Sequence, residues 1–492
     1  MMTTNMIPES VSETREKLWD HMRNPRMVFR TLSCGTNSLL LAYLPYLVDT
    51  VILQQVLLPY FEKLPDENID PETILGNVPI AHFTKTMDYR QVSDHLVRGW
   101  IYLQIEGMAC GLLLYVARMP SRSLGEAQVE TQIFGPQVAF TEALETNLGV
   151  LQGYLSTDML TNVPITIGKR SRTDVEVCYM EELAAPENVQ TVIQRLRDLD
   201  IDGVIDSGKL VQLIDDNTFS IFPQLILTER PDHVSEALLE GKVAVFVEGS
   251  PFAIVGPSSF VDFFKSNEDL YIRWQMASFI RLLRFSALFV SLFFTATYVA
   301  ALTFHYEMIP SALLVSLVKS RSKVPFPPLF EALLLEMIIE FLREAGARLP
   351  FKVGQTIGIV GGIVIGQAAV AAGFTSNILI MIVALSALAS FTFPSYMMST
   401  AVRILRFPII VLAGIWGGFG IMLGASFLLI HILRQSSLGR PFFLPFFPFR
   451  LQDIKNSLIR FPFYSLGKRP AMTRSPDDTR VPDEAGKKRP VQ

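Results

Sequence analysis

The sequence contains one long uncharged stretch, VGQTIGIVGGIVIGQAAVAAGFTSNILIMIVALSALASFTFPSYMMSTAV (residues 353–402), in which no Asp, Glu, Lys or Arg occurs. A fold surrounded by water exposes charged side chains far more often than this. A helix needs about 20 consecutive apolar residues to cross a hydrocarbon core of roughly 30 Å. We therefore predict that this stretch lies in a membrane and that the chain is an integral membrane protein.

The rest of the chain divides by composition. Half of the residues (50%) are hydrophobic and the mean hydropathy is +0.33, but up to about residue 270 the charges are spread as in a globular protein. The fold class we predict is an α/β cytoplasmic N-terminal region, with two subdomains, followed by an all-α polytopic membrane domain. The expected boundaries are a tail at 1–25, an α/β domain at 26–270 with its subdomain boundary at 155–187, a membrane domain at 271–434, and a tail at 435–492, disordered from about residue 468.

Short apolar and β-branched runs in the N-terminal region predict strands, and three- and four-residue apolar spacing predicts helices between them. The predicted strands are 39–48, 100–106, 111–118 and 243–247, and the predicted helices are 136–154, 188–199 and 235–239. The first residues show no apolar signal-peptide core, so we expect this region to stay in the cytoplasm.

Four segments are long and apolar enough to be membrane spans, and a fifth is ambiguous. The spans are 285–304, 353–373, 378–394 and 407–430, while 326–349 is apolar but carries several charges and could lie at the interface, re-enter the membrane or cross it. Arg273, Arg281 and Arg284 before the first span favour a cytoplasmic N-terminal region. If the chain crosses the membrane four times, Arg403 and Arg406 lie on the outer side. If segment 326–349 is a fifth crossing, they lie on the cytoplasmic side.

Several function classes receive no support from the sequence. The six histidines show no zinc-protease spacing, and the chain has neither a P-loop nor a nucleophile elbow, so we predict no enzyme activity, no cofactor and no metal site. Asp215 and Asp216 lack the rest of a calcium loop. Three widely spaced cysteines argue against a disulfide framework. The net charge of −4 argues against nucleic-acid binding.

A row of glycines marks the predicted span 353–373. Gly354, Gly358, Gly362 and Gly366 recur every four residues on one helix face, and Gln367 adds a polar group at membrane depth. Because glycine destabilises a helix, such a row indicates close approach of another backbone. Packing within one subunit, a subunit interface and a narrow pore wall all satisfy this requirement.

A row of carboxylates marks the segment 326–349. Glu336, Glu340 and Glu344 fall on one helix face with Arg343 beside them. In a single subunit this predicts a wetted face with internal salt bridges. In a ring of subunits the same face would form rings of carboxylate that concentrate cations at a pore.

Residues 265–450 resemble the membrane region of the A subunits of bacterial spore germination receptors, the Ger A type. The matching motifs are SFIRLLRFSALFV (278–290), FHYEMIP (304–310), VPFPPLFEALLLEMIIEFLREAGARLP (324–350), the glycine-rich 353–373, FPSY (393–396) and RILRFPII (403–410). The segment 120–151 matches less closely, because Ala127 replaces a proline of the family pattern and Phe134 replaces an arginine.

The resemblance implies a nutrient receptor subunit in the inner membrane of the dormant spore. Its implied partners are a B-type membrane subunit, a C-type lipoprotein, membrane lipid and further copies of itself, with a pentamer as the expected assembly and a monovalent cation channel as the expected activity. A stage V sporulation A-F-type relative would carry similar motifs. A non-conducting scaffold is the alternative of a different class. Inverted repeats would favour a third alternative, a secondary transporter, but the sequence does not show them.

Overall fold

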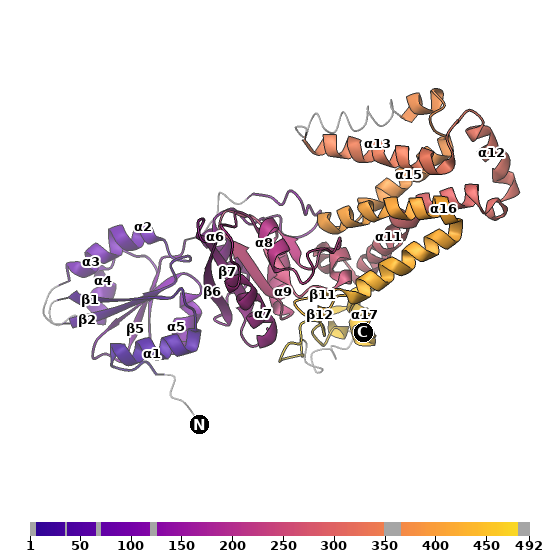
Figure 1. Ribbon diagram of the computed structural model, residues 1–492. Coiled ribbons are helices and arrows are strands. Elements are labelled where there is room, and N and C mark those ends of the chain that lie inside the picture. The colour runs from indigo at the N-terminus through magenta and orange to yellow at the C-terminus, as the bar shows by residue number, and fades with distance from the viewer. Residues whose placement is uncertain (1–5, 35–36, 65–69, 119–124, 349–365, 481–492) are drawn as a thin grey trace, which may run out of the picture. The chain divides into compact units, whose positions relative to one another are not determined.

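The computed structural model describes residues 6–34, 37–64, 70–118, 125–348 and 366–480 (Figure 1). These residues form two compact units. The α/β unit comprises 1–218, 225–258 and 467–492, and the helical unit comprises 219–224 and 259–466, in each case within the described ranges. The predicted fold class is confirmed, since an α/β region precedes a helical one.

The first half of the α/β unit is a five-stranded sheet with strand order β1-β2-β4-β5-β3 and antiparallel neighbours. Its strands are β1 (Val28–Cys34), β2 (Asn37–Tyr43), β3 (Phe83–Thr86), β4 (Trp100–Ile105) and β5 (Gly111–Tyr115). Its helical segments are α1 (Val11–Met22), α2 (Thr50–Ile52), η1 (Leu53–Leu57), α3 (Leu58–Glu62), α4 (Pro71–Asn77) and α5 (Tyr89–Leu96).

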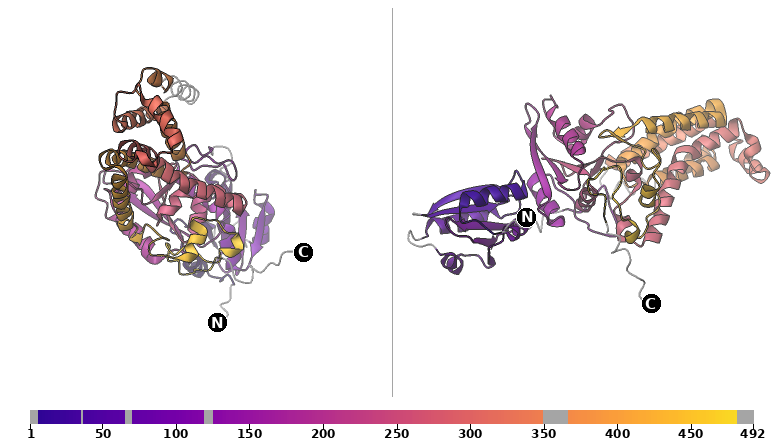
Figure 2. Two further views of the ribbon diagram at one scale, coloured as in Figure 1. Left: turned by 90° about the vertical axis from the view of Figure 1, so that its right-hand side faces the viewer. Right: turned by 90° about the horizontal axis from the view of Figure 1, so that it is seen from below.

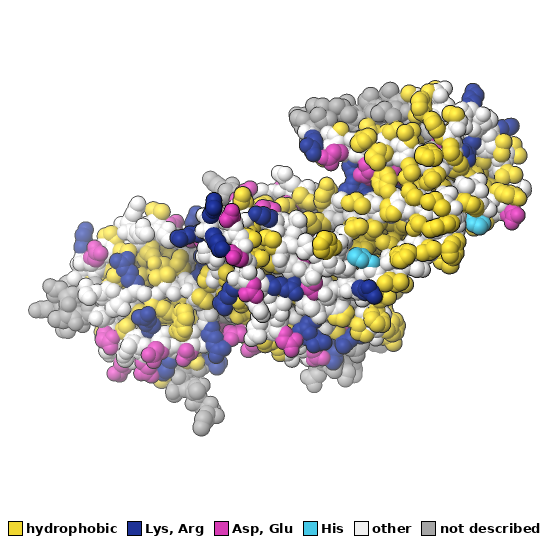
Figure 3. Space-filling model, viewed as in Figure 1, with side chains coloured by type: hydrophobic (Ala, Val, Ile, Leu, Met, Phe, Trp, Pro, Cys, Tyr) yellow, Lys and Arg dark blue, Asp and Glu magenta, His cyan; other side chains and the backbone are white. Residues whose placement is uncertain are grey.

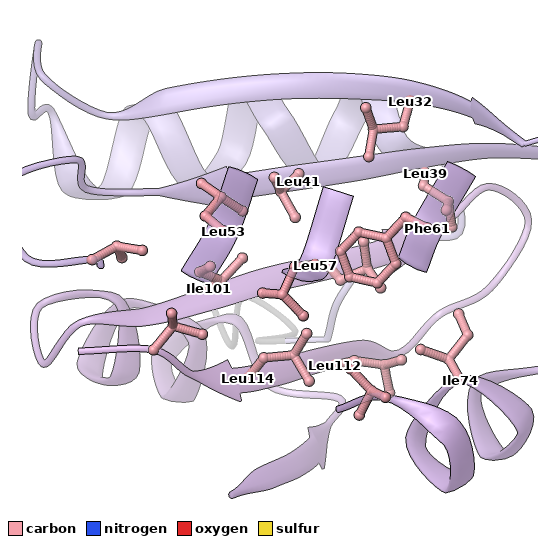
Figure 4. Packing of buried hydrophobic residues seen from close by; sticks show 14 of the residues in the cluster. Leu32, Leu39, Leu41, Leu53, Leu57, Phe61, Ile74, Ile101, Leu112 and Leu114 are labelled. Atoms are coloured by element: carbon pink, nitrogen blue, oxygen red, sulfur yellow. The ribbon is translucent and has the colours of Figure 1, made fainter. Parts of the chain in front are cut away.

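Helices cover both faces of this sheet, with α2 to α4 on one face and α1 and α5 on the other (Figure 1). Leu53, Leu57 and Phe61 recur at four-residue intervals and bury the same helix face against the apolar side chains of the sheet, as Figure 4 shows. The predicted tail at 1–25 is wrong for α1, which packs on the unit through Val11, Leu18 and other buried residues. Its many charged residues lie on the solvent side and concealed the helix in the composition.

The second half of the α/β unit is another antiparallel five-stranded sheet, with order β6-β7-β9-β10-β8. Its strands are β6 (Leu160–Ile167), β7 (Thr173–Met180), β8 (Ile226–Thr228), β9 (Val243–Val247) and β10 (Ala253–Gly256), and its helices are α6 (Leu144–Tyr154), α7 (Pro186–Arg197), α8 (Ser207–Ile214) and α9 (Pro231–Leu239). Because α6 packs on α9, the subdomain break precedes residue 144 and is earlier than the expected 155–187. The polar residues Asn162 and the fully buried Glu176 interrupt the apolar pattern of this hairpin, and Pro164 in β6 argues against a strand because it lacks a backbone N–H, so the pattern did not reveal the hairpin.

The segment 467–480, which we call the C-terminal strap, returns to the α/β unit. Met472 and Thr473 are buried, and Asn188 Nδ2 donates a hydrogen bond to the Thr473 carbonyl oxygen. Arg480 pairs with Glu236 and Arg469 donates to the Leu239 carbonyl oxygen. The disorder expected from residue 468 is therefore wrong for the strap, because its backbone and its arginines find hydrogen-bond and ion-pair partners on α7 and α9.

The helical unit begins with η2 (Phe260–Phe264) and α10 (Glu268–Tyr271). Its long helices are α11 (Trp274–Thr303), α12 (Ser311–Arg321), α13 (Pro328–Arg348), α15 (Asn377–Ser390) and α16 (Tyr396–Arg434), and its short segments are η3 (Tyr306–Met308), β11 (Ser436–Ser437), β12 (Arg440–Pro441), α17 (Leu451–Ser457) and η4 (Phe463–Ser465). Among the described residues, α11 and α16 are long and apolar enough to cross a membrane. They run side by side in Figures 1 and 2.

Helix α16 is broken in the middle. Gly417 has φ +61° and ψ −138°, so two helical arms, 396–416 and 418–434, meet there at a sharp bend. At 1.5 Å per residue the arms measure about 31 Å and about 26 Å. The continuous span expected over 407–430 is therefore interrupted. The expected span 378–394 corresponds to the shorter α15, and most of 353–373 lies outside the described residues.

Candidate functional site

The helical unit contains two ion pairs between α13 and the first arm of α16, one of them fully buried and the other partly buried. Glu336 pairs with Arg406, and Glu340 pairs with Arg403 at 2.9 Å. We call these four residues the ion-pair ladder. The side chains of Glu336 and Arg406 are 0% and 1% exposed, and those of Glu340 and Arg403 are 24% and 9% exposed. The Glu336–Arg406 pair is thus fully buried, whereas the Glu340–Arg403 pair is partly exposed to solvent.

The spacing of the four residues along their helices explains why both ion pairs can form. Glu336 and Glu340 are four residues apart and Arg403 and Arg406 are three apart, so each pair occupies one face of its helix. Because the earlier Glu pairs with the later Arg, the two helices run antiparallel here. The carboxylates and guanidinium groups therefore meet in register.

Polar side chains of α11 and α15 complete the site. Thr295 Oγ1 donates to Glu336 Oε1 at 2.8 Å, and Arg406 Nη2 donates to Ser291 Oγ at 3.4 Å. Arg343 lies 3.5 Å from Glu340 and donates to Ser390 Oγ at 3.1 Å, with its guanidinium 4.4 Å from the centre of the Phe391 ring. The ladder therefore connects α11, α13 and α16, and Arg343 adds the contact with α15.

A third buried carboxylate lies nearer the start of α13. Glu331 Oε1 accepts hydrogen bonds from the Ser376 backbone N–H at 2.7 Å and from Thr375 Oγ1 at 3.2 Å. Arg321, at the end of α12, lies 3.4 Å from Glu331. This carboxylate fixes the start of α15 against α13.

In apolar surroundings such charges are stable only when paired and hydrogen-bonded. Removing either partner leaves an uncompensated charge, whereas the intact pair contributes little net stability compared with an apolar core. Buried ion pairs between apolar helices are therefore a candidate functional site. The ladder can act as a latch that holds one arrangement until a competing interaction separates the pairs.

The charged residues that the sequence analysis selected lie in different surroundings in the structure. Glu336 and Glu340 are brought together with arginines, so Glu336 does not lie on the wetted face that one subunit was expected to show. Glu344 is exposed and pairs only with Arg348, one turn along the helix, among the described contacts. Arg281 and Arg284, taken from the sequence as charges flanking a span, are buried and pair with Asp269.

The glycine row is only partly visible. Gly354, Gly358 and Gly362 lie outside the described residues. Among the described residues, no atom lies within 4 Å of a Cβ built on Gly366, and Gln367 is exposed. Within the helical unit, other segments closely approach glycines that include Gly373, Gly414 and Gly417, where a built Cβ would lie 2.8, 2.7 and 2.9 Å from atoms of Lys323, Leu329 and Phe304.

Sequence reasoning missed Arg403 and Arg406 as ion-pair partners and used them only to orient the membrane spans. A signal was present, because three-residue spacing of Arg403 and Arg406 complements the four-residue spacing of Glu336 and Glu340. It missed Ser291 and Thr295 altogether. Those residues form an i,i+4 pair of small hydroxyl side chains in the largely apolar second half of α11.

The α/β unit contains a second buried polar cluster, formed by the segment that follows residue 125. The backbone N–H groups of Val129 and Glu130 donate to Glu229 Oε1 at 2.6 and 3.0 Å, and Arg230 Nη2 donates to the Pro136 carbonyl oxygen. The Glu130 carboxyl is buried and accepts from Thr228 Oγ1, and burial, reinforced by Glu229, raises its pKa to about 7. The cluster anchors this segment to β8 and α9.

Comparison with known proteins gives a consistent assignment. Residues 15–472 match the sequence model of the family described as Bacillus/Clostridium GerA spore germination protein. The chain is 43% identical to spore germination protein GerQA of Bacillus cereus over 98% of this chain and 97% of that protein. It is 35% identical to spore germination protein KA of Bacillus subtilis (strain 168), covering 96% of this chain and 88% of that protein.

One solved structure is also similar, the N-terminal domain of the A subunit of the Bacillus megaterium spore germinant receptor GerK3. It covers 52% of this chain and 98% of that chain at 24% identity, with a TM-score of 0.41. The family match includes most of both units and all four residues of the ion-pair ladder. This chain belongs to the GerA family of spore germination proteins.

Proposed function

We propose that this protein is the A-type subunit of a nutrient germinant receptor in the inner membrane of a dormant spore. The observation that carries the proposal is the family match over residues 15–472, supported by a relative that matches almost end to end. The two long apolar helices α11 and α16 suit a membrane location. We further propose that the helical unit crosses the membrane several times.

The proposed assembly includes a B-type membrane subunit, a C-type lipoprotein and further copies of this chain, with five copies as the working number. One feature of α13 supports association between helices. Phe330, Leu334, Met337 and Phe341 are exposed and recur at spacings of four, three and four residues, on another face from the ladder. Such a seam is typical of helices that pack against a second helix.

The proposed activity is a monovalent cation path whose closed arrangement the ion-pair ladder stabilises. Nutrient binding to a partner subunit would favour a second arrangement of α13 and α16, and the cost of separating the buried pairs would keep the resting population closed. The carboxylates released by opening would then face the path and favour cations. The row at Gly354, Gly358, Gly362 and Gly366 with Gln367 remains our candidate for the wall of that path.

Cation flux through liposomes containing the purified protein tests this proposal. The double variant Glu336→Gln, Glu340→Gln leaves Arg403 and Arg406 without their carboxylates, so we expect flux without nutrient to rise and cation preference to fall. Glu344→Gln is the matched control, because it neutralises an exposed glutamate on the same helix.

Flux is normalised to folded, assembled protein. Lower flux with reduced cation preference would indicate carboxylates that already line a pore, not a latch. Absence of flux from the unmodified protein and from all variants, in the presence of the partner subunits, would favour the non-conducting scaffold. Normal nutrient germination of spores that lack this chain and its relatives would contradict the receptor role itself.

A further inference from the structure

An exposed aromatic surface lies at the end of the helical unit where α11 begins. Phe447, Phe449 and Leu451 are 59%, 66% and 68% exposed, and Phe463 is more than half exposed. These side chains come from the phenylalanine-rich run after β12 and from the segments α17 and η4. We call residues 443–463 the aromatic collar. A water-facing surface rarely exposes so many large apolar side chains together.

Hydrogen bonds fix the collar at the first turns of α11. Ser278 Oγ donates to the Arg460 carbonyl oxygen at 2.9 Å, and Arg281 Nη1 donates to the Asn456 carbonyl oxygen at 2.6 Å. In return, Arg460 donates to the Ile272 carbonyl oxygen at 3.2 Å. The collar therefore lies at the level where α11 starts, not along its length.

The start of α11 has the same surface character. Trp274, Met276 and Phe279 are exposed in its first turns, and Tyr271 is exposed just before them. The hydrogen bonds thus hold the collar beside the exposed apolar first turns of a helix long enough to cross a membrane. Figure 3 shows hydrophobic side chains covering most of the visible face of the helical unit.

Basic side chains accompany this surface. Arg273 precedes α11, Arg434 ends α16 and Arg450 lies within the collar, and all three are exposed. Tryptophan, tyrosine and arginine next to large apolar groups form the composition that settles at the boundary between headgroups and acyl chains. Anionic headgroups complement the arginines.

We infer that the aromatic collar is a membrane-interface element, whose phenylalanines enter the headgroup region of an anionic lipid surface beside the start of α11. The inference rests on the proposed membrane location of the helical unit. The inference assigns a lipid-binding surface to the collar, a segment that does not itself span the membrane. Through its bonds to Ser278 and Arg281, the collar would hold the start of α11 at a fixed depth.

Spin-label accessibility of the full-length protein tests the inference in nanodiscs of phosphatidylethanolamine and phosphatidylglycerol. The background carries Cys34→Ser and Cys110→Ser, while Cys178 stays because it is fully buried and burial raises the pKa of its thiol, which makes it unreactive. Labels are placed by Phe449→Cys in the collar, Phe289→Cys on the exposed face of α11 and Asp198→Cys on the α/β unit.

We expect the label at 449 to show an oxygen-to-nickel accessibility ratio several-fold above the label at 198 and below the label at 289. Arg450→Gln, or omission of phosphatidylglycerol, should move the ratio at 449 toward the aqueous value. An aqueous ratio at 449 with a lipid ratio at 289 would overturn the collar alone.

Shielding of the label at 449 from both reagents would show that protein covers the collar, and would also overturn the inference. An aqueous ratio at 289 would overturn the membrane location on which both proposals rest. The four results are distinguishable in one set of samples.

Discussion

At the scale of single residues, the helical unit contains charged side chains that are buried between apolar helices, where an unpaired charge is unfavourable. Glu336 and Arg406 are almost completely buried, and Thr295 and Ser291 of α11 supply hydrogen bonds that the pair itself cannot make. A buried pair of this kind adds little stability relative to apolar residues of similar size, but losing one partner is expensive. Its contribution is to specify which helix faces meet.

The first prediction concerns this pair. Arg406→Met should lower the free energy of unfolding by roughly 3–5 kcal/mol, because Glu336 remains buried without its partner. The double variant Glu336→Leu, Arg406→Met should recover most of that loss. Thermal unfolding in detergent micelles measures both effects. Equal destabilisation by the single and double variants would show that the charges are not coupled.

The second prediction concerns Glu130. Burial raises its pKa from 4.5 to about 7, so between these values the folded chain holds a proton that the unfolded chain has released. The free energy of unfolding should therefore fall as pH rises from about 5 to about 7, by an amount on the order of a few kcal/mol at most. Glu130→Gln should remove this slope.

Chemical unfolding of the α/β unit, followed by tryptophan fluorescence at several pH values, measures the slope. Glu126→Gln serves as the control, because Glu126 is exposed. A Glu130→Gln protein with the same pH dependence as the unmodified chain would assign the slope to another group.

At the scale of elements, the break in α16 gives the helical unit two arms from one apolar run. Gly417 adopts a positive φ, and a Cβ there would lie 2.9 Å from Phe304 Cβ. His305 Nε2 accepts a hydrogen bond from the Gly418 backbone N–H at 3.1 Å. The end of α11 therefore occupies the corner where the two arms meet.

The third prediction follows from this corner. Gly417→Ala should destabilise the protein by roughly 1–3 kcal/mol, because the backbone conformation and the space both disfavour a side chain. Gly346→Ala should be neutral or slightly stabilising, because Gly346 lies in α13 and no atom of the described residues lies within 4 Å of a Cβ built there. The midpoint temperatures of thermal unfolding of the two variants test this prediction. Similar midpoints for both variants would contradict it.

The helices and strands also show which parts of the fold could be predicted from the sequence. The β4–β5 hairpin, α7 and the α9–β9 unit were predicted closely, because their apolar spacing is local and regular. Helix α1 and the β6–β7 hairpin were missed, because their inward residues find partners far away in the chain. For the same reason the sequence placed Glu336 and Glu340 on one face but did not reveal their arginines, which lie more than 60 residues further on.

At the scale of the whole molecule, several parts of the chain join the start of α11 and the end of α16 at one end of the helical unit. The Phe260 backbone N–H donates to the Phe442 carbonyl oxygen at 2.7 Å. Gln224 Nε2 donates to Gln435 Oε1 at 3.0 Å, although residue 224 precedes every apolar helix. The chain therefore enters and leaves the helical unit at the same end.

The fourth prediction is an even number of membrane crossings. Cysteines introduced by Asp198→Cys and Thr479→Cys should react with a membrane-impermeant thiol reagent from the same side, in right-side-out or in inverted vesicles. The background again carries Cys34→Ser and Cys110→Ser. Labelling of the two positions from opposite sides would require an odd number of crossings and would contradict the docked position of the C-terminal strap.

The docked strap has a consequence for biosynthesis. Since residues 467–480 complete a unit that begins near the first residues, nearly the whole chain must be translated before that unit has all its parts. The helical unit is in effect an insertion into the α/β unit, so it is translated before the last docking step can take place. A ribosome that stops before residue 467 would release an α/β unit with uncovered sites on α7 and α9, which quality-control proteases can distinguish from the finished protein.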